Sequence, residues 1–282
     1  MNSRIIVLFF LGNALFHASF SQKIEVGILL GGANYTGDLN TNTSFQKVGP
    51  SAGVFMRNNI GTRFSFKHAF AYGQVSADDQ LSKNQFQKNR NLSFRTDIFE
   101  VSDMLEFNFL DFLTRSRKMI VSPYVSTGLC VFFFNPQAKY QNRWYDLQPL
   151  GTEGQNDPNY TSNKKYKLYN IAIPIGGGIK VACNRYWSVG LDFQNRVTLT
   201  DYLDDVSTDY VSPVSLPEGN KGIAYKLMDR SGEKGEVIGK PGYQRGSSTK
   251  KDHYMFFSFT LSYTFKSLIC PRPYPEGRFV GN

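Results

Sequence analysis

The chain has 282 residues, a formal net charge of +9 at pH 7, and 24 Phe and 16 Tyr against 2 Trp. Its three cysteines, Cys130, Cys183 and Cys270, are odd in number and far apart. That spacing excludes a disulfide framework and a CxxC zinc site. A basic balance fits nucleic acid, an anionic membrane surface or an acidic partner. The secretory start of the chain, described next, argues against nucleic acid.

The N-terminal segment is typical of a secretory signal peptide. Arg4 precedes the apolar run 5–11, and Ser19 and Ser21 place small residues at the two positions that a signal peptidase reads. We expect cleavage after Ser21, which removes residues 1–21 and leaves a net charge of +8 because Arg4 is the one charged residue in that segment. A transmembrane anchor is the less favoured alternative, since a spanning helix needs about 20 apolar residues.

Eight segments of the mature chain alternate apolar and polar residues, and this period of two indicates β-strands. In the clearest, 254–265, Met255, Phe257 and Phe259 begin an apolar face, and Ser258 and Thr260 begin a polar one. The predicted strands are 23–34, 51–57, 63–73, 95–109, 120–134, 166–182, 187–200 and 253–266.

The connections between these strands alternate strictly in length. The short ones are 58–62, 110–119 and 183–186, and the long ones are 35–50, 74–94, 135–165 and 201–252. Short turns on one side and long loops on the other are typical of outer-membrane barrels, with the short turns in the periplasm. The last loop is too long to lack structure, so we expect short strands or a small folded cap there.

The pattern therefore predicts an all-β fold, an antiparallel transmembrane β-barrel of about eight strands over residues 22–266. Residues 201–252 are its long extracellular loop, and residues 267–282 are a periplasmic C-terminal tail. The predicted location is the outer membrane, in contact with its lipid. The alternative is a soluble periplasmic β-sandwich.

Alternation also places a set of charged side chains on the inner face of this barrel. An eight-stranded barrel is just wide enough to be filled by side chains, so we predict a plugged lumen. His68 and Asp103 break the pattern, because both fall on the apolar face. Either a bulge shifts the register there or the two residues meet a protein partner. The predicted inward-facing charges are Glu25, Lys67, Glu100, Glu106, Lys180, Asp192 and Arg196.

The sequence predicts no catalytic, cofactor-binding or metal-binding residue, and no small-molecule substrate. Mature His68 and His253 form no cluster with Cys and carboxylates, and no G-x-S-x-G motif occurs. A lipid-modifying enzyme built on His253 is the least favoured alternative. The glycines 176–178 precede no predicted helix, so we expect a sharp bend or close packing there rather than a phosphate site. The carboxylates in 200–207 match a calcium loop poorly, and a hydrogen-bonded strand exit is preferred.

Two segments resemble the PorG-like family of outer-membrane barrels, which includes a component of the type IX secretion system. They are Gly-Gly-Ala-Asn-Tyr-Thr-Gly-Asp-Leu at 31–39 and Thr-Asp-Tyr-Leu-Asp-Asp-Val-Ser at 200–207, with Tyr210 beyond. The layout of the whole mature chain is also similar. The resemblance implies association with a periplasmic ring made of a lipoprotein and its partner, PorK and PorN. It implies a role in protein secretion and, in some bacteria, gliding motility.

A plugged, non-catalytic barrel must act through its surfaces. We expect partner contacts at Arg115, Arg117 and Lys118 in one periplasmic turn, and at Arg272 and Arg278 in the Pro-rich tail. Such a tail docks extended on a partner or stays disordered. The predicted function is a type IX secretion component that is not an enzyme, and the main alternative is a small transport or adhesion barrel.

Overall fold

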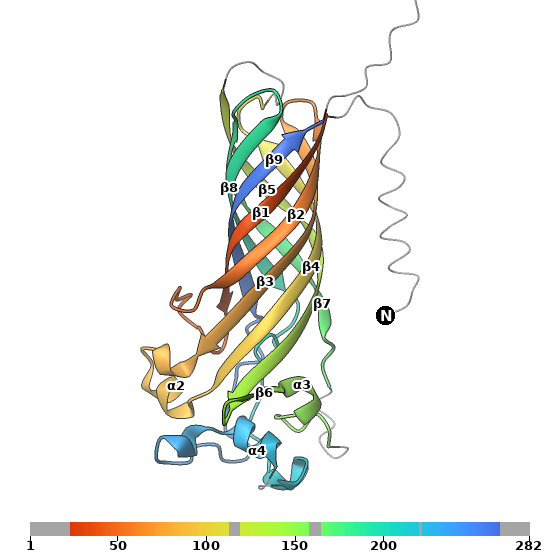
Figure 1. Cartoon of the computed structure of the whole chain (residues 1–282). Coiled ribbons are helices and arrows are strands. Elements are labelled where there is room, and N and C mark those ends of the chain that lie inside the picture. The colour runs from red at the N-terminus through yellow and green to blue at the C-terminus, as the bar shows by residue number, and fades with distance from the viewer. Residues whose placement is uncertain (1–22, 113–118, 158–164, 220–221, 266–282) are drawn as a thin grey trace, which may run out of the picture.

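The computed structural model describes residues 23–112, 119–157, 165–219 and 222–265. Eight of its strands form a closed antiparallel β-barrel, with the long loops gathered at one end (Figure 1). The order around the wall is β4-β3-β2-β1-β9-β8-β7-β5, and pairing of β4 with β5 closes it. The strands are β1 (Lys23–Thr36), β2 (Gly49–Ile60), β3 (Phe64–Asp78), β4 (Ser93–Asn108), β5 (Ile120–Tyr140), β6 (Arg143–Asp146), β7 (Tyr169–Ala182), β8 (Trp187–Thr198) and β9 (His253–Thr264).

The predicted fold class is confirmed, and each of the eight predicted strands is present with shifted ends. The predicted short connection 58–62 begins later than expected, because β2 continues to Ile60 and the turn begins at Gly61, whose φ is +72°. The reason is Asn59, whose side chain points into the barrel. It donates to Glu25 Oε1 at 2.7 Å and accepts from Ser65 Oγ at 2.7 Å, which holds the segment in the sheet.

The segment 135–165, predicted as a loop, contains strand structure. β5 runs on to Tyr140 and pairs with β6, which lies outside the barrel wall. Gln141 and Asn142 both have positive φ, as a tight two-residue hairpin turn requires. The hairpin therefore extends the wall beyond its mouth on the long-loop side (Figure 1).

The long loops carry short helices that form a folded cap over the barrel mouth. The loop between β8 and β9 contains helices and one isolated bridge, Asp209 with Gln244. The expected cap is confirmed, built from helices rather than strands. In the described part of the chain, no helix has the length and apolar character needed to cross a membrane. The helices are η1 (Asp79–Leu81), α2 (Gln85–Arg90), α3 (Leu147–Leu150), η2 (Pro213–Ser215), α4 (Ile223–Met228) and η4 (Ser231–Glu233).

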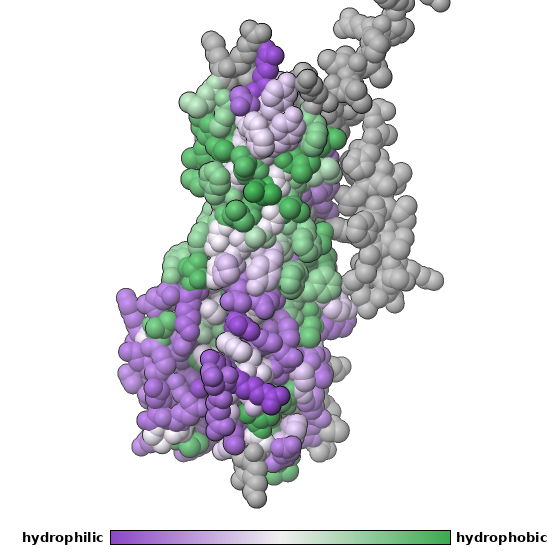
Figure 2. Space-filling view, viewed as in Figure 1, coloured by the Kyte–Doolittle hydropathy of each residue, from purple (hydrophilic) through white to green (hydrophobic). Residues whose placement is uncertain are grey.

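The outer wall of the barrel is an exposed apolar surface, whereas the loop end is polar (Figure 2). Soluble monomers rarely expose apolar patches larger than a few hundred Å². A continuous apolar wall is the outer surface that a transmembrane barrel presents to lipid. Its exposed side chains include Ile24, Val26, Ile28, Leu30, Val54, Phe70, Phe99, Leu105, Val125, Leu129, Ile171, Ile175, Leu191, Phe193 and Phe259.

The inner face holds a buried ionic network near the short-turn end. Arg57 donates to Glu25 and to Glu106, each at 2.8 Å. Lys180 donates to the same Glu106 at 2.7 Å, and Lys67 Nζ lies 3.9 Å from its other oxygen. All seven charges predicted to face inward are buried in the lumen, five of them in or beside this network. Arg57 was not among the predicted inward charges.

The charges of this network balance. Lys67 donates to Asp192 at 2.5 Å, so three carboxylates face three cations. The ring of Phe55 lies 4.9 Å from the Arg57 guanidinium carbon and 5.0 Å from Lys67 Nζ. Neutrality matters because an unpaired charge in a dry interior is strongly destabilising.

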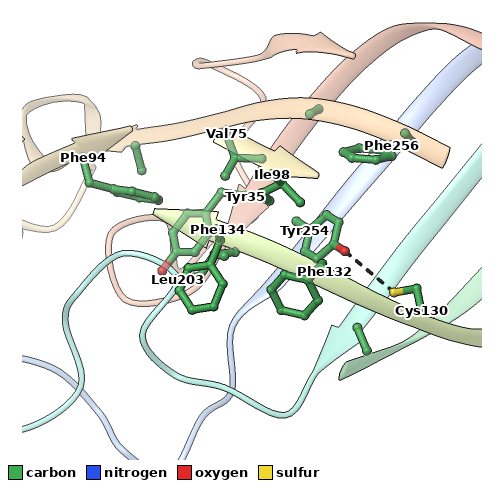
Figure 3. Close-up of a cluster of buried hydrophobic side chains, with 14 of the residues drawn as sticks. Tyr35, Val75, Phe94, Ile98, Cys130, Phe132, Phe134, Leu203, Tyr254 and Phe256 are labelled. Carbon is green, nitrogen blue, oxygen red and sulfur yellow. Dashed lines mark hydrogen bonds between the residues drawn. The ribbon is translucent and has the colours of Figure 1, made fainter. Parts of the chain in front are cut away.

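Nearer the loops, the lumen is filled first by a second ion pair and then by aromatic rings. Arg196 Nη2 donates to Glu100 Oε1 at 2.6 Å, and Tyr254 donates to Glu100 Oε2 at 2.8 Å. A buried apolar cluster then occupies the barrel mouth (Figure 3). Leu203, from the loop after β8, inserts into this cluster. From the Glu100–Arg196 ion pair to the barrel mouth, the described side chains fill the lumen and form the predicted plug. The cluster includes Tyr35, Val75, Phe94, Ile98, Phe132, Phe134, Leu203, Val206, Tyr254 and Phe256.

Glycines in β7 allow close packing, as the sequence predicted. A Cβ at Gly176 would lie 2.1 Å from Phe193 O, and one at Gly178 would lie 2.0 Å from Leu191 O and 3.0 Å from the Tyr124 ring. The Tyr124 ring in turn lies 4.4 Å from Lys180 Nζ. Gly178 therefore makes room for an aromatic ring that packs against the ionic network.

We predict that Arg57→Met lowers the free energy of unfolding by about 3–5 kcal/mol, because it leaves Glu25 and Glu106 buried without their main cation. Denaturant unfolding in lipid vesicles measures the change. Arg63→Met is the matched control, since Arg63 pairs with Asp111 on the exposed turn. No measurable loss is expected there. Equal behaviour of the two variants would contradict the assignment.

Candidate functional site

The candidate site is the place where the four long loops meet the barrel mouth, here named the cap junction. At its centre Tyr35 of β1 donates to Asp204 Oδ2 at 2.5 Å and contacts Asp252 Oδ1 at 2.8 Å. Tyr35 belongs to segment 31–39 and Asp204 to segment 200–207. The two segments that carry the family resemblance therefore meet in space, although they are far apart in sequence.

Acidic side chains in the loop between β8 and β9 accept hydrogen bonds from the backbone where the chain leaves β8. Asp204 accepts from Val206 N at 3.0 Å, and Asp252 accepts from Leu203 N at 2.8 Å. Thr96 Oγ1 of β4 donates to Leu203 O at 2.8 Å and so holds the loop inside the mouth. The predicted hydrogen-bonded strand exit at 200–207 is confirmed.

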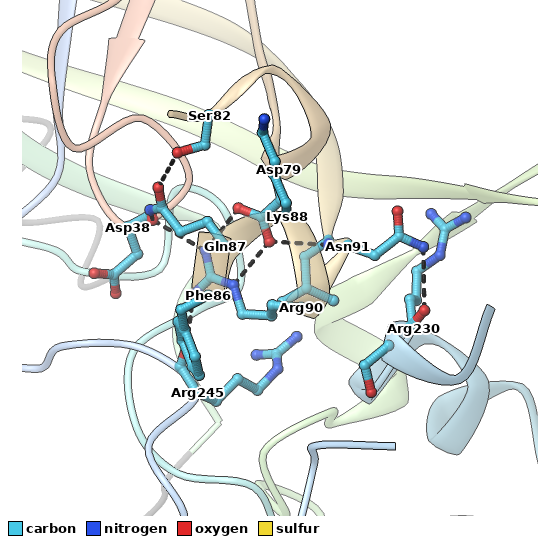
Figure 4. A network of polar contacts seen from close by, with 12 residues as sticks. Asp38, Asp79, Ser82, Phe86, Gln87, Lys88, Arg90, Asn91, Arg230 and Arg245 are labelled. Carbon is cyan, nitrogen blue, oxygen red and sulfur yellow. Dashed lines mark hydrogen bonds and ion pairs between the residues drawn. The ribbon is translucent and has the colours of Figure 1, made fainter. Parts of the chain in front are cut away.

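Arg90 connects three of the four loops (Figure 4). The Asn84 side chain caps the first turn of α2, and Asn91, with φ of 61°, ends the helix, so that Arg90 falls in its last turn. Its guanidinium binds both carboxylate oxygens of Asp79 at 2.8 Å. It also donates to Asp38 O at 3.0 Å and to Arg245 O at 2.6 Å.

Arg245 connects the remaining loop. Its Nη1 donates to Glu153 Oε1 at 2.7 Å and to Asp205 O at 2.6 Å. Glu153 also accepts from the backbone N–H groups of Ser207 and Thr208. Because Arg90 donates to the backbone of Arg245, the two arginines tie all four loops into one unit. Sequence reasoning did not find either residue, since both lie in polar loops without a motif.

Burial raises the pKa of several carboxyl groups at the cap junction. The pKa of Asp201 rises from 3.8 to about 7 because burial penalises its charged form, and nearby Asp38 adds to the shift. For the same reason the pKa of Asp205 rises to about 6 despite the Arg245 guanidinium. Burial also raises the pKa values of Asp204 and Asp252, which repel each other's charge. Burial at the cap junction therefore favours the protonated form of these carboxyl groups more than solvent would.

The cap junction shows no arrangement for metal chemistry. Among the described residues, no group of three or more His, Cys, Asp and Glu side chains is placed to hold a metal ion. His253 lies at the start of β9, where its backbone pairs with Thr36, and its side chain lines a surface cavity with Lys250 and Lys251. Its position is that of a strand-end residue beside a basic surface.

His68 and Asp103 lie on the outer face, as their register predicted. They are direct cross-strand partners on β3 and β4, and the ladder runs without a bulge from Phe64–Phe107 to Asp78–Ser93. His68 Nδ1 donates to Asp103 Oδ1 at 2.5 Å. The bulge alternative is therefore excluded.

The predicted partner contacts Arg115, Arg117, Lys118, Arg272 and Arg278 lie outside the described residues, as do the signal peptide and its cleavage site. Of the cysteines, Cys130 is buried in the lumen and Cys183 is exposed, and both are free.

We predict that the cap loosens as the pH rises. A carboxyl whose pKa is higher in the folded state binds its proton more tightly there, so its contribution to folding is lost above the unfolded pKa. For Asp201 the window runs from 3.8 to about 7. Amides in 200–208 should exchange faster near pH 8 than near pH 5 after correction for intrinsic rates. Asp201→Asn should flatten this profile, whereas exposed Asp209→Asn should not. Equal protection at both pH values would contradict the prediction.

Several solved structures are similar to this chain. The N-terminal β-barrel domain of Pseudomonas aeruginosa OprF is 10% identical, with a TM-score of 0.36 over 86% of this chain and 99% of that chain. Neisserial surface protein A is 8% identical, with a TM-score of 0.39 over 87% and 98%. A major outer membrane protein from Thermus thermophilus is 11% identical, with a TM-score of 0.35 over 86% and 99%.

No curated protein matches the chain. One family model does match, over residues 3–222, and its description is a domain of unknown function, DUF6089. That range covers well over half of the sequence, so the chain belongs to the DUF6089 family.

Proposed function

We propose that this protein is a non-catalytic outer-membrane β-barrel that acts as a scaffold for protein secretion. One observation carries the proposal, namely the neutral ionic network and aromatic cluster that fill the lumen. A barrel filled in this way offers solutes no wide path, so its function lies on its surfaces. The apolar outer wall supports insertion in a membrane. The secretory signal expected at 1–21 supports the outer membrane as its location.

The proposed machine is the type IX secretion system, and the partners are a periplasmic ring of the PorK and PorN type. The support is the resemblance at 31–39 and 200–207, together with the Tyr35–Asp204 hydrogen bond that joins these two segments. In this proposal the basic residues Arg115, Arg117 and Lys118 and the tail 267–282 contact the ring from the periplasmic side. Gliding motility is a further output of the same machine in some bacteria.

A second candidate function is adhesion through the cap. The two arginines at the cap junction fix the loops in one arrangement, which removes the ordering cost that a mobile loop meets on binding. Exposed apolar side chains project from this rigid surface, among them Trp144, Val214 and Tyr243. The guanidinium of Arg95 stacks on Trp144 at 3.9 Å and holds its ring in place.

The first test is a pull-down from detergent-solubilised outer membrane. We expect the full chain to retain a periplasmic ring and the variant lacking 267–282 to retain less of it, because the tail supplies basic contacts. Heat-modifiable migration in gels shows that the shortened barrel still inserts. Unchanged co-purification would remove the tail from the mechanism, and recovery of the chain in the soluble periplasm would refute the barrel's location.

The second test separates a plugged scaffold from a transport barrel. In planar bilayers we expect no steady open level for the wild-type chain, because the paired charges at Arg57, Glu106 and Lys180 span the lumen. A steady conductance would contradict the plug and favour transport. Binding of the purified chain to host-cell surfaces, lost when Trp144 and Tyr243 are replaced by Ser, would favour adhesion.

A further inference from the structure

The outer wall carries one hydrogen-bonded polar pair, His68 and Asp103, inside its apolar band. On β3 and β4 the outward cross-strand pairs run from Phe64–Phe107 through Phe66–Leu105, His68–Asp103 and Phe70–Val101 to Tyr72–Phe99. The next outward pair is Gln74–Asp97, which is polar and hydrogen-bonded at 2.8 Å.

The pair therefore lies at the middle of the band. Two apolar pairs separate it from each edge. Eight residues at about 3.4 Å each, tilted by about 40°, span roughly 20 Å along the membrane normal. His68 and Asp103 are then about 10 Å from either edge, near the midplane. That is the depth at which polar groups on a lipid-facing wall are most unfavourable.

The pair is not withdrawn from the wall. The side chains remain 25% and 17% exposed, so both still reach the outer surface. Their neighbours in the same row are Met56 on β2 and Leu129 on β5, and Leu129 is 55% exposed. A histidine and a carboxylate in the midst of apolar side chains mark a place where protein rather than lipid covers the wall.

We propose that this face binds a second copy of the same chain. The proposal rests on membrane insertion, and on no other part of the proposed function. Two copies inserted in the same direction carry identical apolar bands. A residue of one copy therefore lies at the same membrane depth as the equivalent residue of the other copy. A two-fold axis along the membrane normal places the imidazole ring of His68 in one copy opposite the carboxyl group of Asp103 in the other. The polar pattern of this face is therefore self-complementary, whereas a different partner would need matching groups at this one depth.

The surrounding surface suits such a contact. Val54, Phe70 and Leu129 flank the pair and are about half exposed. In the proposed dimer, this apolar set packs against the corresponding set of the other copy. The two His–Asp pairs then form one polar group of four residues. Hydrogen bonds between protein segments in a membrane supply modest stability that depends on both partners.

The test measures dimerisation of full-length chains in phosphatidylcholine vesicles by energy transfer between fluorescent dyes. The dyes are attached to the exposed Cys183, and Cys270 is replaced by Ser so that it is not labelled. The variant His68→Leu with Asp103→Leu removes the polar pair and suits a lipid-facing wall. We expect it to dimerise roughly tenfold more weakly than the wild type. The matched control replaces Ile28 and Leu261 by Ala, a cross-strand pair on the outer face of β1 and β9, and should dimerise as the wild type does.

A mixing experiment tests the geometry itself. A chain with His68→Asp and a chain with Asp103→His should each lose self-association, and the two together should form a mixed dimer. Heat-modifiable migration confirms that each variant is inserted, so a failure of insertion is told apart from a failure of dimerisation. A monomeric wild type, or a double-leucine variant that dimerises equally well, would overturn the proposal. So would a different membrane protein that binds this face while the chain itself stays monomeric.

Discussion

The guanidinium of Arg57 lies between Glu25 and Glu106, and the narrow interior of the barrel depends on that bridge. Three carboxylates on different strands would repel one another in a space with little water. Arg57, Lys67 and Lys180 neutralise them and leave Glu106 in contact with all three cations. Strands β1 to β4, β7 and β8 each contribute a member, so the network fixes the wall from inside.

Because the interior is filled by side chains, the surfaces that remain available for binding are the two ends of the barrel and its outer wall. At the loop end, Arg90 and Arg245 join segments that are separated by up to about half the chain. The four loops are therefore hydrogen-bonded into one unit, and aromatic residues such as Trp144 and Tyr243 are exposed at this end. In the proposed function, contacts with a secretion machine lie at the opposite, short-turn end.

Much of the barrel was predictable because alternation is strong where one face is apolar and the other polar. Strands β4, β8 and β9 show this alternation clearly, and it correctly placed Glu100 and Glu106 of β4 and Asp192 of β8 inside the lumen. Arg57 was missed because β2 is rich in small residues and its predicted end fell on Arg57 itself. β6 was missed because four residues between polar neighbours carry little pattern.

The cap junction was predictable in part. The carboxylates at 200–207 were recognised as a hydrogen-bonded exit, because Asp side chains readily accept backbone N–H groups at strand ends. The other residues of the cap junction, Tyr35, Arg90 and Arg245, were not identified. A pairing between residues 155 positions apart, such as that of Arg90 with the Arg245 carbonyl, leaves no local signal in either segment.

The seam between β1 and β9 has a consequence for the order of assembly. Tyr35 and Tyr254 are register partners across this seam, and Asp252, which holds the Tyr35 hydroxyl, comes just before β9 begins. One segment of the chain, Asp252 with β9, therefore both closes the wall and supplies an anchor of the cap. The wall cannot close, and the cap cannot be tethered to Tyr35 through Asp252, before β9 has paired with β1.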